Sequence, residues 1–180
     1  FPVDRARRIL LEPLEDGSWF RVHGQAVQGY TRGNSGGVPA GFACYIYAEV
    51  DVPVTSSCLF VDGDVYQGDG EAERVGVALE LARGGEVNFR VATSFISVAQ
   101  AKQNFDREGG GRSFEALTAA NEAVWEERLG RIEIDGATDI QRQTFYSCLY
   151  RTQLFPRIWH EPDYSGNPIH YSPYDGQLHK

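Results

Sequence analysis

Hydrophobic and polar residues alternate along much of the first hundred residues, which is the pattern of strands that bury one face. Between Phe42 and Val52 the residues at every second position fall on one side of an extended chain, and most of them are apolar. We therefore expect a half-buried strand over 42–52. Turn residues separate this stretch from other short alternating stretches, and that arrangement predicts an antiparallel β-sandwich.

Two further alternating stretches, Val75–Leu81 and Val87–Phe95, flank Gly84–Gly85. Glycine adopts the positive φ angles of tight turns, so this pair is predicted to form a β-hairpin. Trp19–Tyr30 is a further predicted strand, interrupted at Gly24.

From Ser97 onward the pattern becomes helical. Ser97 and Gln100 have the spacing of a capping box, so a short helix is predicted from Ser97 to about Arg107, where Gly109–Gly111 stops it. A second helix is predicted between Ser113 as N-cap and Gly130 as terminator, because its apolar residues form one stripe.

One short strand is then predicted over Arg131–Asp135, followed by a helix that begins at Thr138. Thr138 and Gln141 have the reciprocal capping-box spacing. The apolar residues of this helix are spread around its circumference, so we expect burial on most sides, although the chain offers too little surface to bury it. Pro156 is predicted to end the helix, and the aromatic tail that follows is predicted to be irregular.

The composition and net charge of the chain argue against some classes of function. The chain has 180 residues, a net charge of -8 and 42% hydrophobic content, which suit one domain, or one domain and part of another. The acidic charge argues against nucleic acid as a partner. No stretch is apolar enough to predict a membrane span, and no signal segment opens the chain. Because the sequence starts at Phe1 and has no Met, we expect the true start to lie elsewhere.

The three cysteines, Cys44, Cys58 and Cys148, have no metal-type spacing. We expect buried free thiols, with a Cys44–Cys58 disulfide as the less favoured alternative.

Three segments contain residue types that occur in ligand-binding sites. Asp62–Glu73 is acidic, but it lacks the oxygen ligand and the glycine that an EF-hand loop needs, so a solvated hairpin turn is favoured. His160–Glu161 has no second histidine at helical spacing, which argues against zinc. Asn34–Gly37 lacks the ending of a phosphate-binding loop, and a sharp turn between strands is favoured.

Four segments carry a resemblance to a known family. Gln143–Thr152, Phe155–Arg157 and His170–Gly176 follow one another in the second half, and Gly29–Pro39 lies upstream. Together they resemble glycoside hydrolase family 92, the calcium-dependent exo-acting α-mannosidases. Because members of that family are several times longer, this chain would be an internal portion.

The resemblance implies an α+β fold in three parts: a β-sandwich portion over 1–95, a helical linker over 96–136, and the start of an (α/α)6 toroidal catalytic domain over 137–180. It also implies that the loop at Asn34–Gly37 packs between sandwich and toroid.

The implied activity is removal of terminal α-linked mannose, expected to be α-1,2-linked, by an inverting mechanism. The catalytic acid and base, and the calcium ion, would lie in the catalytic domain downstream of this chain, so the chain alone is expected to be inactive. Its implied partners are a mannose-containing glycan and the remainder of the catalytic domain. The implied location is periplasmic or secreted.

Within this chain the resemblance points to the aromatic tail for substrate binding, specifically Arg157, Trp159, His170 and Tyr174. Aromatic side chains of this kind stack on sugar rings. The alternative, equally weighted, is that the aromatic residues pack against further helices. Two other functions stay open for the whole chain: a non-catalytic carbohydrate-binding sandwich, and a structural module whose partner surface is the helix that begins at Thr138.

Overall fold

The computed structural model describes residues 6–13, 17–34, 36–61, 64–67, 70–72, 74–82, 85–155 and 157–180. The chain divides into two compact units. The first contains residues 1–110 together with 160–180, and the second contains residues 111–159.

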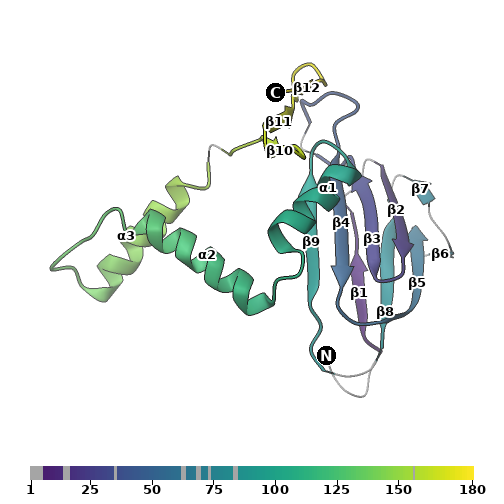
Figure 1. Cartoon of the computed structure of the whole chain (residues 1–180), viewed down its shortest axis with the longest axis horizontal. Helices are drawn as coiled ribbons and strands as arrows, with labels where there is room; N and C mark the ends of the chain where they lie inside the picture. The colour runs from purple at the N-terminus through teal and green to yellow at the C-terminus, as the bar shows by residue number, and fades with distance from the viewer. Residues whose placement is uncertain are drawn as a thin grey trace. The chain divides into compact units, whose positions relative to one another are not determined.

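The first unit is a β-sandwich (Figure 1). Among the described residues, one antiparallel sheet has the strand order β1-β8-β5-β6 and the other has the order β7-β2-β3-β4-β9. The strands of the first sheet are β1 (Arg8–Leu11), β8 (Gly76–Leu81), β5 (Val54–Val61) and β6 (Asp64–Tyr66). Those of the second are β7 (Gly70–Ala72), β2 (Ser18–His23), β3 (Ala26–Thr31), β4 (Cys44–Val50) and β9 (Phe89–Ser94).

Apolar side chains from the facing sides of the two sheets form the main core. Its buried members are Phe20, Val27, Ala48, Val50, Leu59, Val75, Val77, Leu79 and Leu81. Val77 and Leu79 are fully buried, and both belong to the alternating set that predicted a strand. The sandwich prediction and the α+β class are confirmed.

Strand β4 is covered on both faces. Ala48 and Val50 point into the main core, as the alternation predicted. Tyr47, on the opposite face, is also buried, because its ring packs against Ala101 and Phe105. The strand prediction is therefore confirmed, but the expectation of a half-buried strand is wrong, because a helix covers the second face.

Two predicted strand arrangements differ from the structure. Trp19–Tyr30 is a hairpin of β2 and β3, with Gly24 at a φ of 61° in the turn. The predicted hairpin of Val75–Leu81 with Val87–Phe95 is wrong, because β8 pairs with β1 and β5 whereas β9 pairs with β4. Alternation identifies a strand but not its partner, and this connection crosses from one sheet to the other. Of the proposed turn, Gly84 lies outside the described residues.

The hairpin predicted in the acidic segment is present as the pairing of β5 with β6, which joins Val61 to Asp64. The predicted turn positions Asp62 and Gly63, and the acidic residues Asp69 and Glu73, lie outside the described residues.

The helix predicted after Ser97 is α1 (Val98–Asn104), extended by one π-helical turn over Phe105–Gly109. The Ser97 Oγ accepts a hydrogen bond from the Gln100 N–H at 3.0 Å, as a cap should. The reciprocal half of the predicted capping box is wrong, because the Gln100 amide bonds instead to Asn104 Oδ1 and to the Pro162 carbonyl oxygen.

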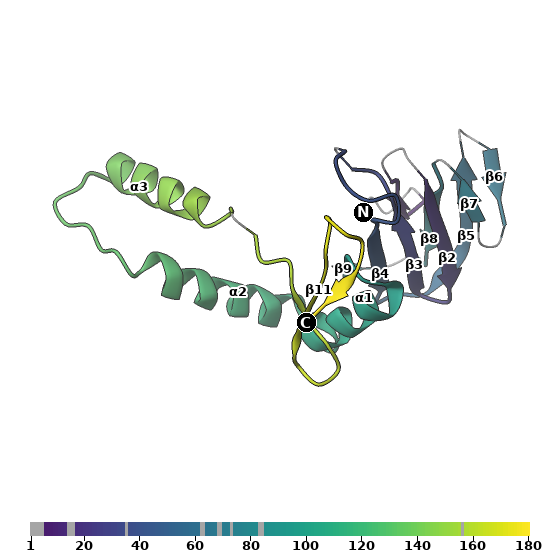
Figure 2. The ribbon, with the colours of Figure 1, turned by 90° about the horizontal axis from the view of Figure 1, so that it is seen from above.

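The second unit contains α2 (Phe114–Leu129) and α3 (Asp139–Thr152), visible as the two green helices in Figure 2. Ser113 caps α2, and both halves of the capping box predicted for Thr138 and Gln141 are formed. The rings of Trp125 and Tyr150 join the two helices, with centroids 4.6 Å apart. Within the described residues, no side chain of α2 or α3 is buried.

The strand predicted over Arg131–Asp135 is wrong. The carbonyl oxygens of this segment bond to side chains of α3: Ile132 accepts from the Tyr146 hydroxyl and Ile134 from the Arg142 guanidinium. Helix α3 also ends at Thr152, before Pro156, which lies outside the described residues.

The predicted irregular tail is ordered into strands β10 (Glu161–Pro162), β11 (Pro168–Tyr171) and β12 (Leu178–His179), which pair in that order. That prediction is therefore wrong. These strands have two to four residues each, which is too short for alternation to be recognised.

Gly76 provides a test of the outer packing of the first sheet. A Cβ atom at this position would lie 2.2 Å from Cζ of Phe60. Gly76→Ala should therefore lower the free energy of unfolding by about 1–3 kcal/mol, since the ring must leave its place. Urea unfolding followed by circular dichroism measures this change. Gly109→Ala is the matched control, because no atom beyond its chain neighbours and its own helix backbone lies within 4 Å of its added Cβ. Equal losses in both variants would contradict the packing described.

The apolar surface of the second unit predicts self-association of the isolated chain. Ile140 and Phe155 are each 77% exposed, and apolar surface of this extent on a soluble protein normally has a partner. Static light scattering at micromolar concentration should show oligomers. The variant with Ile140→Ser and Phe155→Ser should associate less. A monomer at every concentration would contradict the prediction.

Candidate functional site

The loop between β3 and β4 is held by local hydrogen bonds. Asn34 Nδ2 donates to the Arg32 carbonyl oxygen, and Asn34 Oδ1 accepts from the Gly36 N–H, both at 2.7 Å. Gly36 and Gly37 have φ angles of 92° and 77°, which only glycine adopts readily. The predicted sharp turn between strands is confirmed, and Ser35 lies outside the described residues.

A second turn lies in the tail between β11 and β12. The buried Ser172 accepts hydrogen bonds at Oγ from the Tyr174 and Asp175 N–H groups, and its carbonyl oxygen accepts from the Gly176 N–H. The Gln177 N–H donates to the Asp175 carboxylate and is the main reason why the pKa of that carboxyl lies below its usual value. Hydrogen bonds with the Ser172 and His179 side chains lower the pKa further. Hydrogen bonds among its own residues therefore hold this turn in place.

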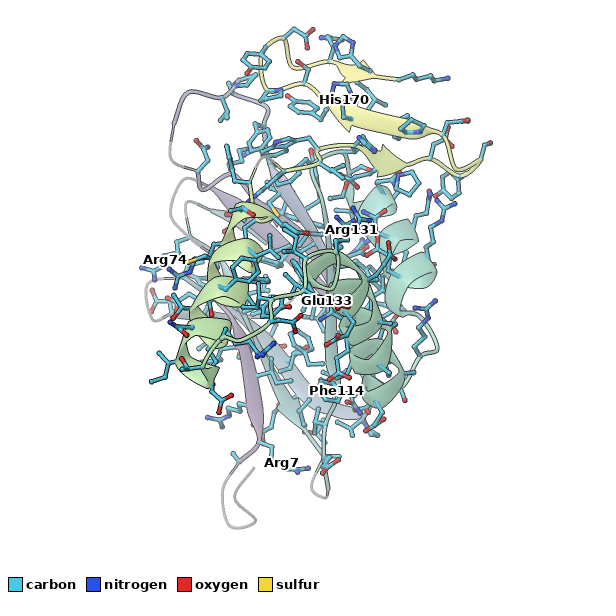
Figure 3. The ribbon with its side chains drawn as sticks, turned by 90° about the vertical axis from the view of Figure 1, so that its left-hand side faces the viewer. Arg7, Arg74, Phe114, Arg131, Glu133 and His170 are labelled. Atoms are coloured by element: carbon cyan, nitrogen blue, oxygen red, sulfur yellow. The ribbon has the colours of Figure 1, made fainter. Side chains whose placement is uncertain are left out.

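These two turns meet at one end of the sandwich (Figures 1 and 3). The Phe42 ring contacts the Tyr171 ring with centroids 5.9 Å apart, and it also stacks on the Phe95 ring at 5.3 Å. At Gly176 an added Cβ would lie 3.3 Å from the Tyr171 hydroxyl oxygen and 3.6 Å from Pro39 Cβ. Two of the segments that carry the family resemblance are therefore in contact. We call this cluster the loop–tail junction: Pro39, Gly41, Phe42, Phe95, Tyr171 and Gly176.

Glu161 connects the start of the tail to the sandwich. Its Oε1 accepts from the Phe95 N–H at 2.9 Å and its Oε2 accepts from Asn104 Nδ2 at 2.7 Å. Gln100 and Gln103 of α1 both donate to the carbonyl oxygen of Pro162 at 2.9 Å. The tail is therefore attached through charged and neutral hydrogen bonds to α1 and to Phe95, the residue that follows β9.

Cys44 lies close enough to this network to be affected by its charge. Burial, and secondarily the negative charge of Glu161, raise the pKa of the Cys44 thiol. The three cysteines are free, as expected, but Cys148 is exposed and Cys44 and Cys58 are half-buried. The expectation of buried thiols is therefore wrong for Cys148, because no described residue of its unit buries it.

The four predicted substrate-binding residues lie in different units. His170, labelled in Figure 3, lies on β11, where its ring stacks on that of His179. Tyr174 is 95% exposed in the tail turn. Arg157 and Trp159 belong to the second unit, where Trp159 is 42% exposed. The structure thus places His170 and Tyr174 next to the loop–tail junction.

The second unit contains a hollow of about 610 Å³ lined by residues of the resemblance segment on α3. Gln143, Tyr146, Ser147 and Tyr150 contribute to it, with Leu129 from α2. Arg142 and Arg151 of α3 also line it, so it is an open groove in which charged, polar and aromatic side chains are mixed.

No three His, Cys, Asp or Glu side chains among the described residues are grouped so that they hold a metal ion. Glu161, part of the segment considered for zinc, is engaged by Phe95 and Asn104. The described residues therefore do not fit a calcium site. In the same part of the chain, no helix is long and apolar enough to cross a membrane.

Sequence reasoning missed the attachment of the tail. Gln100 and Asn104 were not recognised as partners of Glu161 and Pro162. One signal was present: Gln100 and Asn104 are four residues apart and flank the fully buried Ala101, so both polar side chains lie on the packed face of α1. Buried amides need partners, and here the tail provides them.

Comparison with solved structures identifies the class of protein. The chain superposes on an inverting mannosidase of family GH92 from Bacteroides thetaiotaomicron with a TM-score of 0.95 and 37% identity, covering 99% of this chain and 25% of that one. An α-mannosidase of the same family and organism, whose structure was solved in complex with mannoimidazole, superposes on this chain with a TM-score of 0.84 and 21% identity. The match covers 100% of this chain and 25% of that one, and it supports the assignment of the fold. The chain thus has the fold of one part of these mannosidase structures.

The family follows from sequence as well. Residues 100–180 match the glycosyl hydrolase family 92 catalytic domain. An uncharacterized secreted glycosidase of Arthroderma benhamiae is 38% identical over 88 residues, which are 46% of this chain and 11% of that protein. The chain belongs to glycosyl hydrolase family 92. It spans about a quarter of the length of the mannosidases whose structures it matches.

The surroundings of Cys44 predict its reactivity. Because its pKa is raised, less thiolate is present at pH 8, and alkylation by iodoacetamide should be roughly tenfold slower or more than at the exposed Cys148. Glu161→Gln removes the nearby negative charge and should accelerate alkylation of Cys44 but not of Cys148. Mass spectrometry of the peptides measures both rates. Faster alkylation of Cys44 than of Cys148 in the unsubstituted chain would contradict this description.

Proposed function

We propose that this chain is part of an exo-acting α-mannosidase that removes terminal mannose, with α-1,2-linked mannose as the preferred substrate, from glycans. The observation that carries the proposal is the 37% identity over 99% of the chain to an inverting mannosidase. A single displacement by water would proceed with inversion, with one carboxylic acid protonating the leaving oxygen and one carboxylate activating the water. We assign both groups to residues outside this chain.

The role proposed for this chain is to build one side of the sugar site. The loop–tail junction holds two turns in fixed positions, and His170 and Tyr174 stand beside it. Tyr174 is 95% exposed, so its ring is available to a ligand. Aromatic rings bind the apolar faces of sugars, and imidazole groups exchange hydrogen bonds with hydroxyls. Arg157 and Trp159 are proposed as further substrate-binding residues.

Calcium is proposed as the cofactor, bound by residues outside this chain, because the described residues offer no suitable group of ligands. A bound divalent cation would supply Lewis-acid polarisation of sugar hydroxyls. A secreted or periplasmic location is also proposed, supported by the secreted glycosidase to which the chain is similar.

Mannose release tests the proposed function. The whole protein that contains this chain should release mannose from α-1,2-mannobiose, and chelation of calcium should abolish the release. The isolated 180-residue chain should show no release above the buffer control, because the acid and base lie outside it. Turnover by the isolated chain would overturn that placement. No turnover by the whole protein on any α-mannoside would overturn the proposed activity and would favour a carbohydrate-binding or structural module.

Trp159 separates a substrate-binding role from a packing role. If its ring contacts the sugar, Trp159→Ala in the whole protein should lower kcat/KM by roughly 10- to 100-fold, the loss expected for one packed aromatic contact of about 1–3 kcal/mol. If its ring belongs to a core, the variant should instead lose about 3–5 kcal/mol of stability with the kinetics of the folded protein preserved. Kinetics and thermal melting of the same variant distinguish the two, and the second outcome would contradict the proposed role.

A further inference from the structure

We propose that Glu161 is a positioning residue of the enzyme: it fixes the place of the tail, and through the tail the place of His170, Tyr171 and Tyr174, without taking part in the chemistry. This inference rests on the mannosidase function proposed above. It identifies a residue of this chain on which sugar binding depends, although that residue touches no sugar.

Both oxygens of the Glu161 carboxylate are used by the protein. One accepts from the Phe95 N–H at 2.9 Å and the other from Asn104 Nδ2 at 2.7 Å. These donors are 66 and 57 positions away in the sequence. A carboxylate that accepts a hydrogen bond at each oxygen is well suited to hold two distant segments together.

The donors are themselves held in place. Asn104 is 7% exposed, and its Nδ2 also donates to the Thr93 carbonyl oxygen at 3.0 Å. Its Oδ1 accepts from Gln100, which is 6% exposed and also donates to the Pro162 carbonyl oxygen. Glu161 therefore binds to a rigid, buried surface formed by β9 and α1, and its neighbour Pro162 binds to the same surface.

The path from Glu161 to the loop–tail junction is short. Glu161 is paired with Ile169 in the β10–β11 ladder, and Ile169 is 7% exposed. The next residues along β11 are His170 and Tyr171, and Tyr171 contacts Phe42 of the loop. Loss of the Glu161 contacts would free the strand that presents these side chains, while the sandwich core, built from other residues, would remain.

Glu161→Gln in the whole protein is the test. The amide keeps one acceptor but places an NH2 group against an N–H donor, so one of the two bonds is lost. Because a hydrogen bond to a charged group is worth about tenfold or more in an equilibrium constant, we expect KM for α-1,2-mannobiose to rise by about tenfold and kcat to change by less than about threefold. The pH dependence of kcat/KM should stay the same.

Two further variants sharpen the result. Glu86→Gln makes the same chemical change at an exposed position of the sandwich unit and should leave KM unchanged. The double variant with Asn104→Asp and Glu161→Gln restores the hydrogen bond between these two side chains with its direction reversed. Position 104 then lacks the donor to the Thr93 carbonyl oxygen, so KM should recover only part of the loss. A residue needed only for general stability would show no such recovery.

Amide hydrogen exchange of the whole protein gives a readout that does not require activity. In Glu161→Gln, exchange should accelerate at the Phe95 N–H and over residues 161–172, with the core strands β5 and β8 unchanged. If the unsubstituted protein cleaves no mannoside, the proposed function fails while this measurement still tests the attachment.

Three outcomes would overturn the inference: unchanged exchange in the tail, a fall in kcat with an altered pH profile, which would make Glu161 a catalytic residue, or a lower melting temperature with unchanged KM, which would make it only structural.

Discussion

The hydrogen bonds of one carboxylate join parts of this chain that are far apart in sequence. Glu161 accepts from Phe95, the residue that follows β9, and from Asn104 of α1. Because of this attachment, residues 160–180 pack with the sandwich although the second unit separates them along the chain. The loop–tail junction depends on the same attachment, since Tyr171 reaches Phe42 only when β11 is held in place.

Burial of apolar side chains stabilises the sandwich beneath this junction. Alternating apolar residues from two sheets fill one core, and the full burial of Val77 and Leu79 explains why β8 is central to its sheet. Ala101 of α1 and Phe105 of the π-helical turn that extends it cover Tyr47 on the far side of β4. The second unit differs, because its apolar side chains have nothing within the described residues to bury them. The proposed partner of this chain, the remainder of the catalytic domain, accounts for that contrast.

Sequence patterns predicted those features of the structure that depend on residues close together in the sequence. The capping box at Thr138 is present with both bonds, because it involves residues three positions apart. The partner of β8 was not predictable, because pairing depends on the crossing between sheets. The capping box at Ser97 failed in part because the Gln100 amide found partners in Asn104 and Pro162. Hydrogen bonds between residues far apart in the sequence produce no local pattern. The only indication of them here is that polar residues lie on the buried face of α1.

The central claim is that the loop between β3 and β4 and the aromatic tail form one surface. A double-mutant cycle on Phe42→Ala and Tyr171→Ala tests it most directly, with stability to urea as the measured quantity. Because their rings are in contact, the coupling energy should be about 0.5–1.5 kcal/mol. Phe42 paired with the exposed Tyr174 is the control and should show coupling near zero. Additive losses for Phe42 and Tyr171 would contradict the account.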